Sequence, residues 1–127
     1  MFPSQEERIQ FGGSDFLELQ YCRLPWGASL QEILSLDSIP HWKNDSLYVS
    51  GDDMDIFDRH YGHLITGGTY HNQTTGPMDL LGINFYSQEQ AAYILEQLQL
   101  ERPPDYQTFE NWLRKGQHYI GFYVLGV

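Results

Sequence analysis

The sequence is poor in cysteine, in basic residues and in long apolar runs. Its 127 residues include one cysteine, Cys22, which excludes an internal disulfide and favours a reducing compartment. No stretch approaches the roughly 18 apolar residues that a membrane-spanning helix needs, and no lysine-led apolar run marks a signal peptide. We therefore expect a cytoplasmic protein with no membrane partner.

The shortage of basic residues leaves a large negative charge. There are 7 Lys and Arg residues against 17 Asp and Glu residues, for a formal net charge of -10 at pH 7. This charge repels nucleic-acid phosphates and anionic lipid headgroups, and it attracts cations across a Debye length of about 8 Å at physiological salt. We expect no nucleic-acid binding, and we expect a basic protein as the partner.

Short catalytic motifs are also missing. The chain has no G-x-S-x-G nucleophile motif, no G-x-x-x-x-G-K-[ST] phosphate loop and no G-x-G-x-x-G dinucleotide fingerprint. Cys22 falls in a predicted strand, where a buried and inert thiol is the usual outcome. The sequence therefore assigns no catalytic residue and no cofactor, and we expect a protein that is not an enzyme.

The chain does have enough apolar and aromatic residues for one core. Hydrophobic residues make up 41% of it and aromatic residues 15%, and its length fits a single domain. The patterns along the chain predict the α+β class, with one compact domain over 1–127. Its sheet is expected to be mostly antiparallel, with three to four short helices packed on it. Residues 1–14 are polar and contain glycine, so we expect them to form an irregular arm.

Hydrophobic periodicity predicts the strands. Residues 15–22 alternate between apolar and polar side chains, which predicts a half-buried strand. Residues 118–127 are apolar on both faces, which predicts a central strand covered on both sides. Further strands are expected at 47–50, 63–66, 69–72 and 78–86, the last two forming an antiparallel pair around a turn at 75–77.

Two capping boxes, at Ser29–Glu32 and Ser87–Gln90, mark helix starts. The first precedes a short helix that ends near residues 36–37, and the second precedes a longer helix with an apolar stripe. Two more helices are expected, one capped by Asp52 or Asp53 and running through Tyr61, the other running from Asp105 or Thr108 to a left-handed cap at Gly116.

The strongest local anomaly is a cluster of aspartates interleaved with aromatic residues. Close carboxylates cost folding free energy unless a cation relieves their repulsion. A calcium loop does not fit, since Phe57 and Asp58 stand where an acid or amide and a glycine are required. One interpretation is a solvated face that keeps the protein soluble. Another is a cation site. The third is a partner-binding surface with acids that steer encounter and rings that supply contact area. Its predicted members are Asp45, Tyr48, Asp52, Asp53, Asp55, Asp58 and Tyr61.

Histidines offer a second candidate site. His60 and His63 share a helix face at i,i+3 spacing, which suits zinc or iron, and His71 and Asp58 are near in sequence. Gly62 and the lack of an H-E-x-x-H motif weaken the pattern. A metal-dependent enzyme using the three histidines is one alternative hypothesis. A structural or regulatory subunit of a phage or secretion system is another.

The favoured hypothesis is a bacterial immunity protein that inhibits a cationic toxin, often a nuclease. The chain's small size, negative charge and lack of catalytic motifs all suit this function. Carboxylates such as Asp52, Asp53 and Asp55 would then take the place of substrate phosphates in the basic cleft of the toxin.

Overall fold

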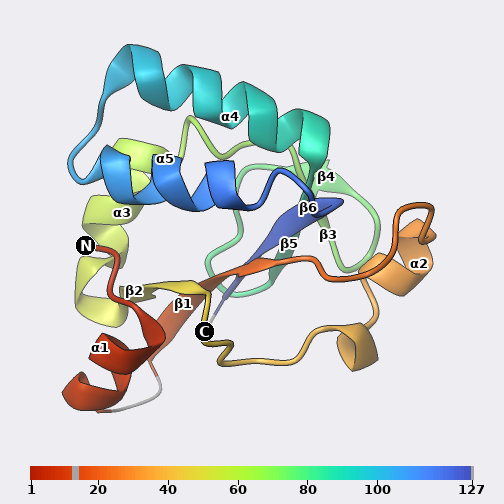
Figure 1. Ribbon diagram of the computed structural model, residues 1–127, viewed down its shortest axis with the longest axis horizontal. Coiled ribbons are helices and arrows are strands. Elements are labelled where there is room, and N and C mark those ends of the chain that lie inside the picture. Colours follow the sequence, from red (N-terminus) through yellow and green to blue (C-terminus); the bar gives the residue numbers. More distant parts are fainter. Residues whose placement is uncertain (13–14, 127) are drawn as a thin grey trace.

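The computed structural model describes residues 1–12 and 15–126 and confirms the α+β class. The described residues form one six-stranded sheet of order β2-β1-β6-β5-β3-β4, in which every neighbouring pair is antiparallel (Figure 1). The strands are β1 (Phe16–Tyr21), β2 (Leu47–Ser50), β3 (Gly68–Tyr70), β4 (Thr75–Gly76), β5 (Ile83–Ser87) and β6 (Gly121–Leu125).

Five α-helices and two 3-10 helices connect these strands in the described part of the chain. They are α1 (Gln5–Phe11), α2 (Leu30–Ile33), η1 (Leu36–Ser38), η2 (Gly51–Asp53), α3 (Met54–Tyr61), α4 (Gln88–Glu101) and α5 (Tyr106–Lys115). The capping boxes predicted at Ser29 and Ser87 are present at the starts of α2 and α4. None of the described helices has both the length and the apolar character that crossing a membrane requires.

The N-terminal segment is folded, so the prediction of an irregular arm is wrong for its described residues. Ser4 caps α1 through a capping box with Glu7, which accounts for one more helix than expected. Phe2 is buried in the core. The carbonyl of Pro3 accepts a hydrogen bond of 3.1 Å from the amide of Tyr48 on β2. The segment therefore covers the outer edge of β2, while residues 13–14 lie outside the described residues.

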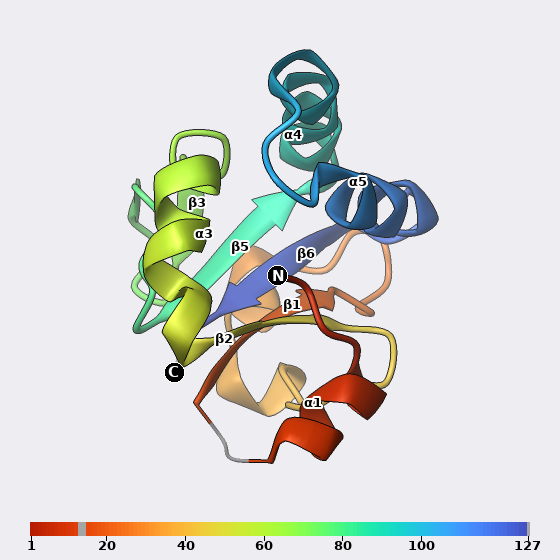
Figure 2. The same cartoon turned by 90° about the vertical axis from the view of Figure 1, so that its left-hand side faces the viewer.

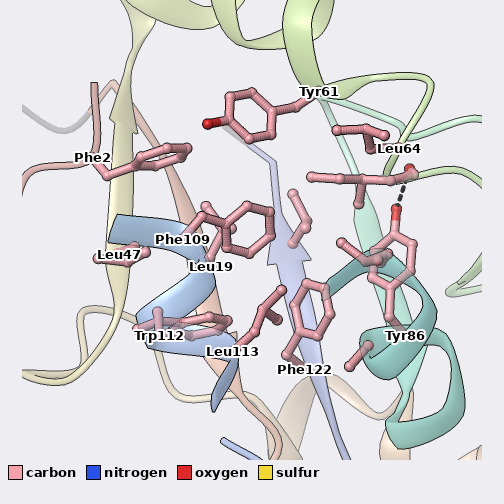
Figure 3. Close-up of a cluster of buried hydrophobic side chains, with 14 of the residues drawn as sticks. Phe2, Leu19, Leu47, Tyr61, Leu64, Tyr86, Phe109, Trp112, Leu113 and Phe122 are labelled. Carbon is pink, nitrogen blue, oxygen red and sulfur yellow. Dashed lines mark hydrogen bonds between the residues drawn. The ribbon is translucent and has the colours of Figure 1, made fainter. Parts of the chain in front are cut away.

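Both faces of the sheet are covered. Helices α3, α4 and α5 pack on one face, and α2, η1 and the loop 40–46 pack on the other, with α1 beside β2 (Figures 1 and 2). The larger core cluster lies under the three helices and includes Phe109 and Phe122 (Figure 3). A smaller cluster on the opposite face includes Cys22 and Tyr123.

This second layer changes the burial expected for β1. All six residues of β1 are buried, and Glu18 and Gln20 are each 1% exposed, so the prediction of a half-buried strand is wrong. The loop 40–46 that covers this face is distant in sequence, and alternation within the strand could not reveal it. Strand β6 is buried at every position, which confirms the prediction of a central strand covered on both sides.

Five buried tyrosines connect the layers. Each donates a hydrogen bond from its hydroxyl group to the backbone carbonyl of another segment, as Tyr86 does to Ile65 at 2.9 Å (Figure 3). Burial raises the pKa of all five hydroxyls well above the usual range, because a phenolate would lose its hydration. The five are Tyr21, Tyr48, Tyr61, Tyr86 and Tyr123.

Three local predictions are wrong. Residues 63–66 form no strand, because the amide of Leu64 bonds back to the carbonyl of Tyr61 and continues the turn after α3. The turn expected at 75–77 contains β4, which pairs with β3. Gly116 has φ -87°, so the end of α5 is not a left-handed cap.

Candidate functional site

A cleft of about 700 Å³ opens beside the outer edge of β2. It lies where the N-terminal segment, η2 and the start of α5 meet, and Figure 2 shows the N-terminus between α1 and α5 on this side. Five carboxylates line it, those of Glu7, Asp15, Asp52, Asp53 and Asp105. We call this site the acidic cleft.

The pairing of β1 with β2 brings two of these acids together. Phe16 pairs with Ser50, which places Asp15 beside Gly51, and the Gly51 amide donates a hydrogen bond of 2.8 Å to the Asp15 carbonyl. A Cβ atom on Gly51 would lie 2.0 Å from Asp15 Oδ2, so the Asp15 carboxylate lies directly against the Gly51 backbone. The next residue, Asp52, then follows directly in η2.

The other acids come from helix termini. Asp53 precedes α3 but makes no side-chain capping bond, in contrast to the capping role predicted for it. Asp105 precedes α5 with φ 61°, a left-handed conformation that aspartate tolerates better than most residues. Glu7 projects from the first turn of α1, where its carboxylate accepts a hydrogen bond from the Ser4 amide at 3.2 Å.

Little positive charge faces the acidic cleft. Among the lining residues that the structure describes, the Met1 amino group is the one cation, 3.1 Å from Asp105 Oδ2. The arginines that form ion pairs within the described residues, Arg23 and Arg114, bind acids outside the cleft. Like charges that line one cleft repel one another, and they do so more strongly beside a protein surface than in bulk water. A cation in the cleft would relieve such repulsion.

The predicted acidic cluster is divided by the fold. Asp52 and Asp53 line the acidic cleft. Asp55 and Asp58 are exposed on α3 and do not line it. Asp45 is paired with an arginine that follows β1. The sequence cluster therefore contributes two of its five acids to the site.

The two tyrosines predicted to contact a partner do not reach the surface. Tyr48 and Tyr61 are both 0% exposed, and each hydroxyl is bonded to a backbone carbonyl. Both rings are therefore buried in the free chain, because strand and helix periodicity turns them inward. Trp26, by contrast, is 63% exposed but does not line the cleft.

Glu7, Asp15 and Asp105 were not predicted as site residues. Each lies in a different part of the sequence, and only the tertiary structure brings them to Asp52 and Asp53. The sequence did contain one indication of this site. An acid stands just before β1 and another just after β2, and the two become neighbours if the strands pair antiparallel. Without the register of that pair, the sequence could not show it.

The three histidines of the alternative hypothesis do not converge. Nε2 of His63 lies 2.7 Å from Oε1 of Glu101, and Nδ1 of His71 donates to the Leu34 carbonyl at 2.9 Å. His60 lies on α3, partly buried. Within residues 1–12 and 15–126, no group of three or more His, Cys, Asp or Glu side chains is placed to hold a metal ion.

One acid is buried on the sheet itself. The Glu18 side chain is 2% exposed, and it accepts hydrogen bonds from the amides of Trp42 at 2.9 Å and Lys43 at 3.1 Å. The Ser46 hydroxyl donates to it at 2.7 Å, and the Gln20 amide at 3.1 Å. The carboxylate therefore fixes the loop 40–46, which the sequence analysis did not anticipate.

Comparison with known proteins finds no matching protein family, curated protein or solved structure.

Proposed function

We propose that this chain is a non-catalytic binding protein whose acidic cleft receives basic side chains of a protein partner. The observation that supports this most is that five carboxylates line one cleft, and a single amino group is the only cation among its described lining residues. The cleft volume of about 700 Å³ lies within the range of ligand pockets, about 300–1,000 Å³. The cleft is therefore large enough to hold side chains of a partner and not only small ions.

The concrete form of the proposal is a bacterial immunity protein that inhibits a cationic toxin. A toxin that acts on nucleic acid needs basic side chains that bind phosphates, and the acidic cleft would bind such side chains in place of the phosphates. The net charge of -10 would steer the encounter at low salt. We place this protein in the cytoplasm, since its one cysteine is free and buried.

The proposal can be tested with an oligoarginine peptide and two charge variants. The first neutralises the cleft by Asp15→Asn, Asp52→Asn and Asp53→Asn. The second neutralises three acids outside its lining, by the substitutions Asp37→Asn, Asp58→Asn and Glu96→Gln. Each variant removes three negative charges from the net of -10, so both change the overall field equally.

We expect the cleft variant to weaken peptide binding by more than about tenfold, or about 1.4 kcal/mol. The control variant should lose much less. Fluorescence anisotropy between about 0.01 M and 0.15 M salt measures both, since the Debye length falls from about 30 Å to about 8 Å across this range. An equal loss in the two variants would show that the peptide responds to net charge alone, and would refute the cleft as the binding site.

The native partner can then be sought with the same variants. Wild-type and cleft-variant protein are immobilised, a host lysate is passed over both, and retained proteins are identified by mass spectrometry. We expect a basic protein that the wild type retains and the cleft variant does not.

A further inference from the structure

Three aromatic rings surround the guanidinium group of Arg8. Its central carbon lies 4.1 Å from the ring centroid of Trp42, 5.3 Å from that of Tyr48 and 5.8 Å from that of Phe16. All three distances fall within the roughly 6 Å limit of a cation–π contact. The Trp42 and Tyr48 rings are stacked 5.9 Å apart, and the Phe16 ring meets Tyr48 edge-on at 6.4 Å. We call Phe16, Trp42 and Tyr48 the aromatic cage.

The cage holds Arg8 through ring faces and one amide. Nε of Arg8 donates to Oε1 of Gln5 at 2.7 Å, and Nε2 of Gln5 donates to the Trp42 carbonyl at 3.0 Å. No carboxylate within the described residues lies at ion-pair distance from Arg8. The rings therefore hold a cation over their faces, and guanidinium stacks on aromatic faces better than an ammonium group does.

The backbone at Trp42 is strained in a way that serves this cage. Trp42 has φ 64°, in the left-handed region that bulky residues rarely adopt. Its amide donates to Oε1 of the buried Glu18 at 2.9 Å, and the hydroxyl oxygen of Tyr48 lies 3.4 Å from Oε2 of the same carboxylate. Glu18 thus fixes the backbone of the Trp42 wall and places an acid behind the rings, which favours a cation in front.

The aromatic cage adjoins the acidic cleft. Phe16 lines the cleft and is also a wall of the cage. Helix α1 directs Glu7 into the cleft and the next residue, Arg8, into the cage. A chain bound in the cleft is therefore within reach of the cage.

We propose that the aromatic cage is a guanidinium-binding site, which Arg8 occupies in the free chain and an arginine of the protein partner occupies in the complex. Arg8 is partly exposed, so its side chain can swing into solvent while α1 stays in place. The incoming arginine regains the ring contacts that Arg8 gives up, so the exchange is nearly neutral and the carboxylates of the cleft provide the net affinity. The identity of the occupant rests on the proposed function, whereas the site itself does not.

The site is tested by emptying it with Arg8→Ala and adding methylguanidinium, with Arg8→Gln as a second variant should the first fold poorly. Calorimetric titration and thermal unfolding both report binding. We expect Arg8→Ala to bind methylguanidinium saturably and at least tenfold more tightly than the wild type. Methylammonium should bind more weakly than methylguanidinium, and Arg59→Ala, which removes an exposed arginine of α3, should behave as the wild type.

Trp42→Gly supplies the matched control, since glycine adopts a positive φ freely and removes only the indole wall. The double variant Arg8→Ala, Trp42→Gly should lose the binding that Arg8→Ala gains. Equal binding by the wild type and Arg8→Ala, or by the single and the double variant, overturns the proposal. If Arg8→Ala gains no methylguanidinium binding while oligoarginine still binds through the cleft, the aromatic cage alone is refuted. If Arg8→Ala binds methylguanidinium as expected while oligoarginine binding does not depend on the cleft, the proposed function alone is refuted.

Discussion

Removal of the buried Glu18 carboxylate should destabilise the fold more than any surface change. Glu18→Ala takes away the acceptor of four hydrogen bonds, from Trp42 and Lys43 amides and from the side chains of Ser46 and Gln20. An unsatisfied buried donor costs about 1–3 kcal/mol. Water can replace the carboxylate for the two amides, which are partly buried, so we expect a loss of about 3–5 kcal/mol.

Glu18→Gln should cost less, and for a geometric reason. Three of the four hydrogen bonds converge on Oε2, and the glutamine oxygen can take that position. Its NH2 group then faces the Trp42 amide, donor against donor, where Oε1 accepts at 2.9 Å. The loss of one hydrogen bond and the repulsion between two facing donors predict that the free energy of unfolding falls by about 1–3 kcal/mol.

Urea unfolding followed by circular dichroism measures both losses. Glu96→Gln serves as the control, because Glu96 is exposed on α4 and its change should stay within about 0.5 kcal/mol. A loss of less than about 1 kcal/mol for Glu18→Ala, or equal losses for the glutamine and alanine variants, would contradict this role of the buried carboxylate.

Three further predictions follow from the fold. Buried tyrosines, whose pKa is raised by burial, stay protonated when folded, but unfolded tyrosines ionise near pH 10. The free energy of unfolding should therefore be unaffected by them below pH 10, and should fall by about 1.4 kcal/mol per pH unit for each of them above it. Urea titrations across this range test the slope, and a flat profile contradicts it. Gly121→Ala places a Cβ 2.1 Å from the Tyr86 carbonyl oxygen, so a loss of more than about 3 kcal/mol is expected; near-native thermal stability would exclude that close approach. Ser87→Ala should cost about 1 kcal/mol through its lost capping bond, whereas Ser35→Ala should cost almost nothing because Ser35 makes no such bond; equal costs in urea unfolding would contradict the capping argument.

The sequence predicts those elements whose signals are local. A capping box lies within four residues, so the starts of α2 and α4 could be read directly at Ser29 and Ser87. The predicted pairing of 69–72 with 78–86 is likewise present, as β3 with β5, since a short connection favours antiparallel neighbours. The capping-box pattern could likewise have located the start of α1 from Ser4 and Glu7.

Features that depend on distant contacts could not be predicted in this way. The burial of Glu18 depends on a loop more than twenty residues further along, which covers the second face of β1. The acidic cleft depends on the β1–β2 register and on the position of α5, which carry Asp15 and Asp105 to Asp52. The aspartates of the predicted cluster are close in sequence and therefore suggested one shared surface. The turn of α3 instead directs their side chains apart.

The proposed function depends on the acidic cleft as the place where cationic side chains bind. Titration of isotope-labelled protein with an oligoarginine peptide, followed by backbone amide chemical shifts, tests this directly. We predict that the largest saturable shifts fall at residues of the cleft, namely Asp15, Gly51, Asp52, Asp53 and Thr108. Shifts spread evenly over the acidic surface, or centred on α2 and α4, would contradict it.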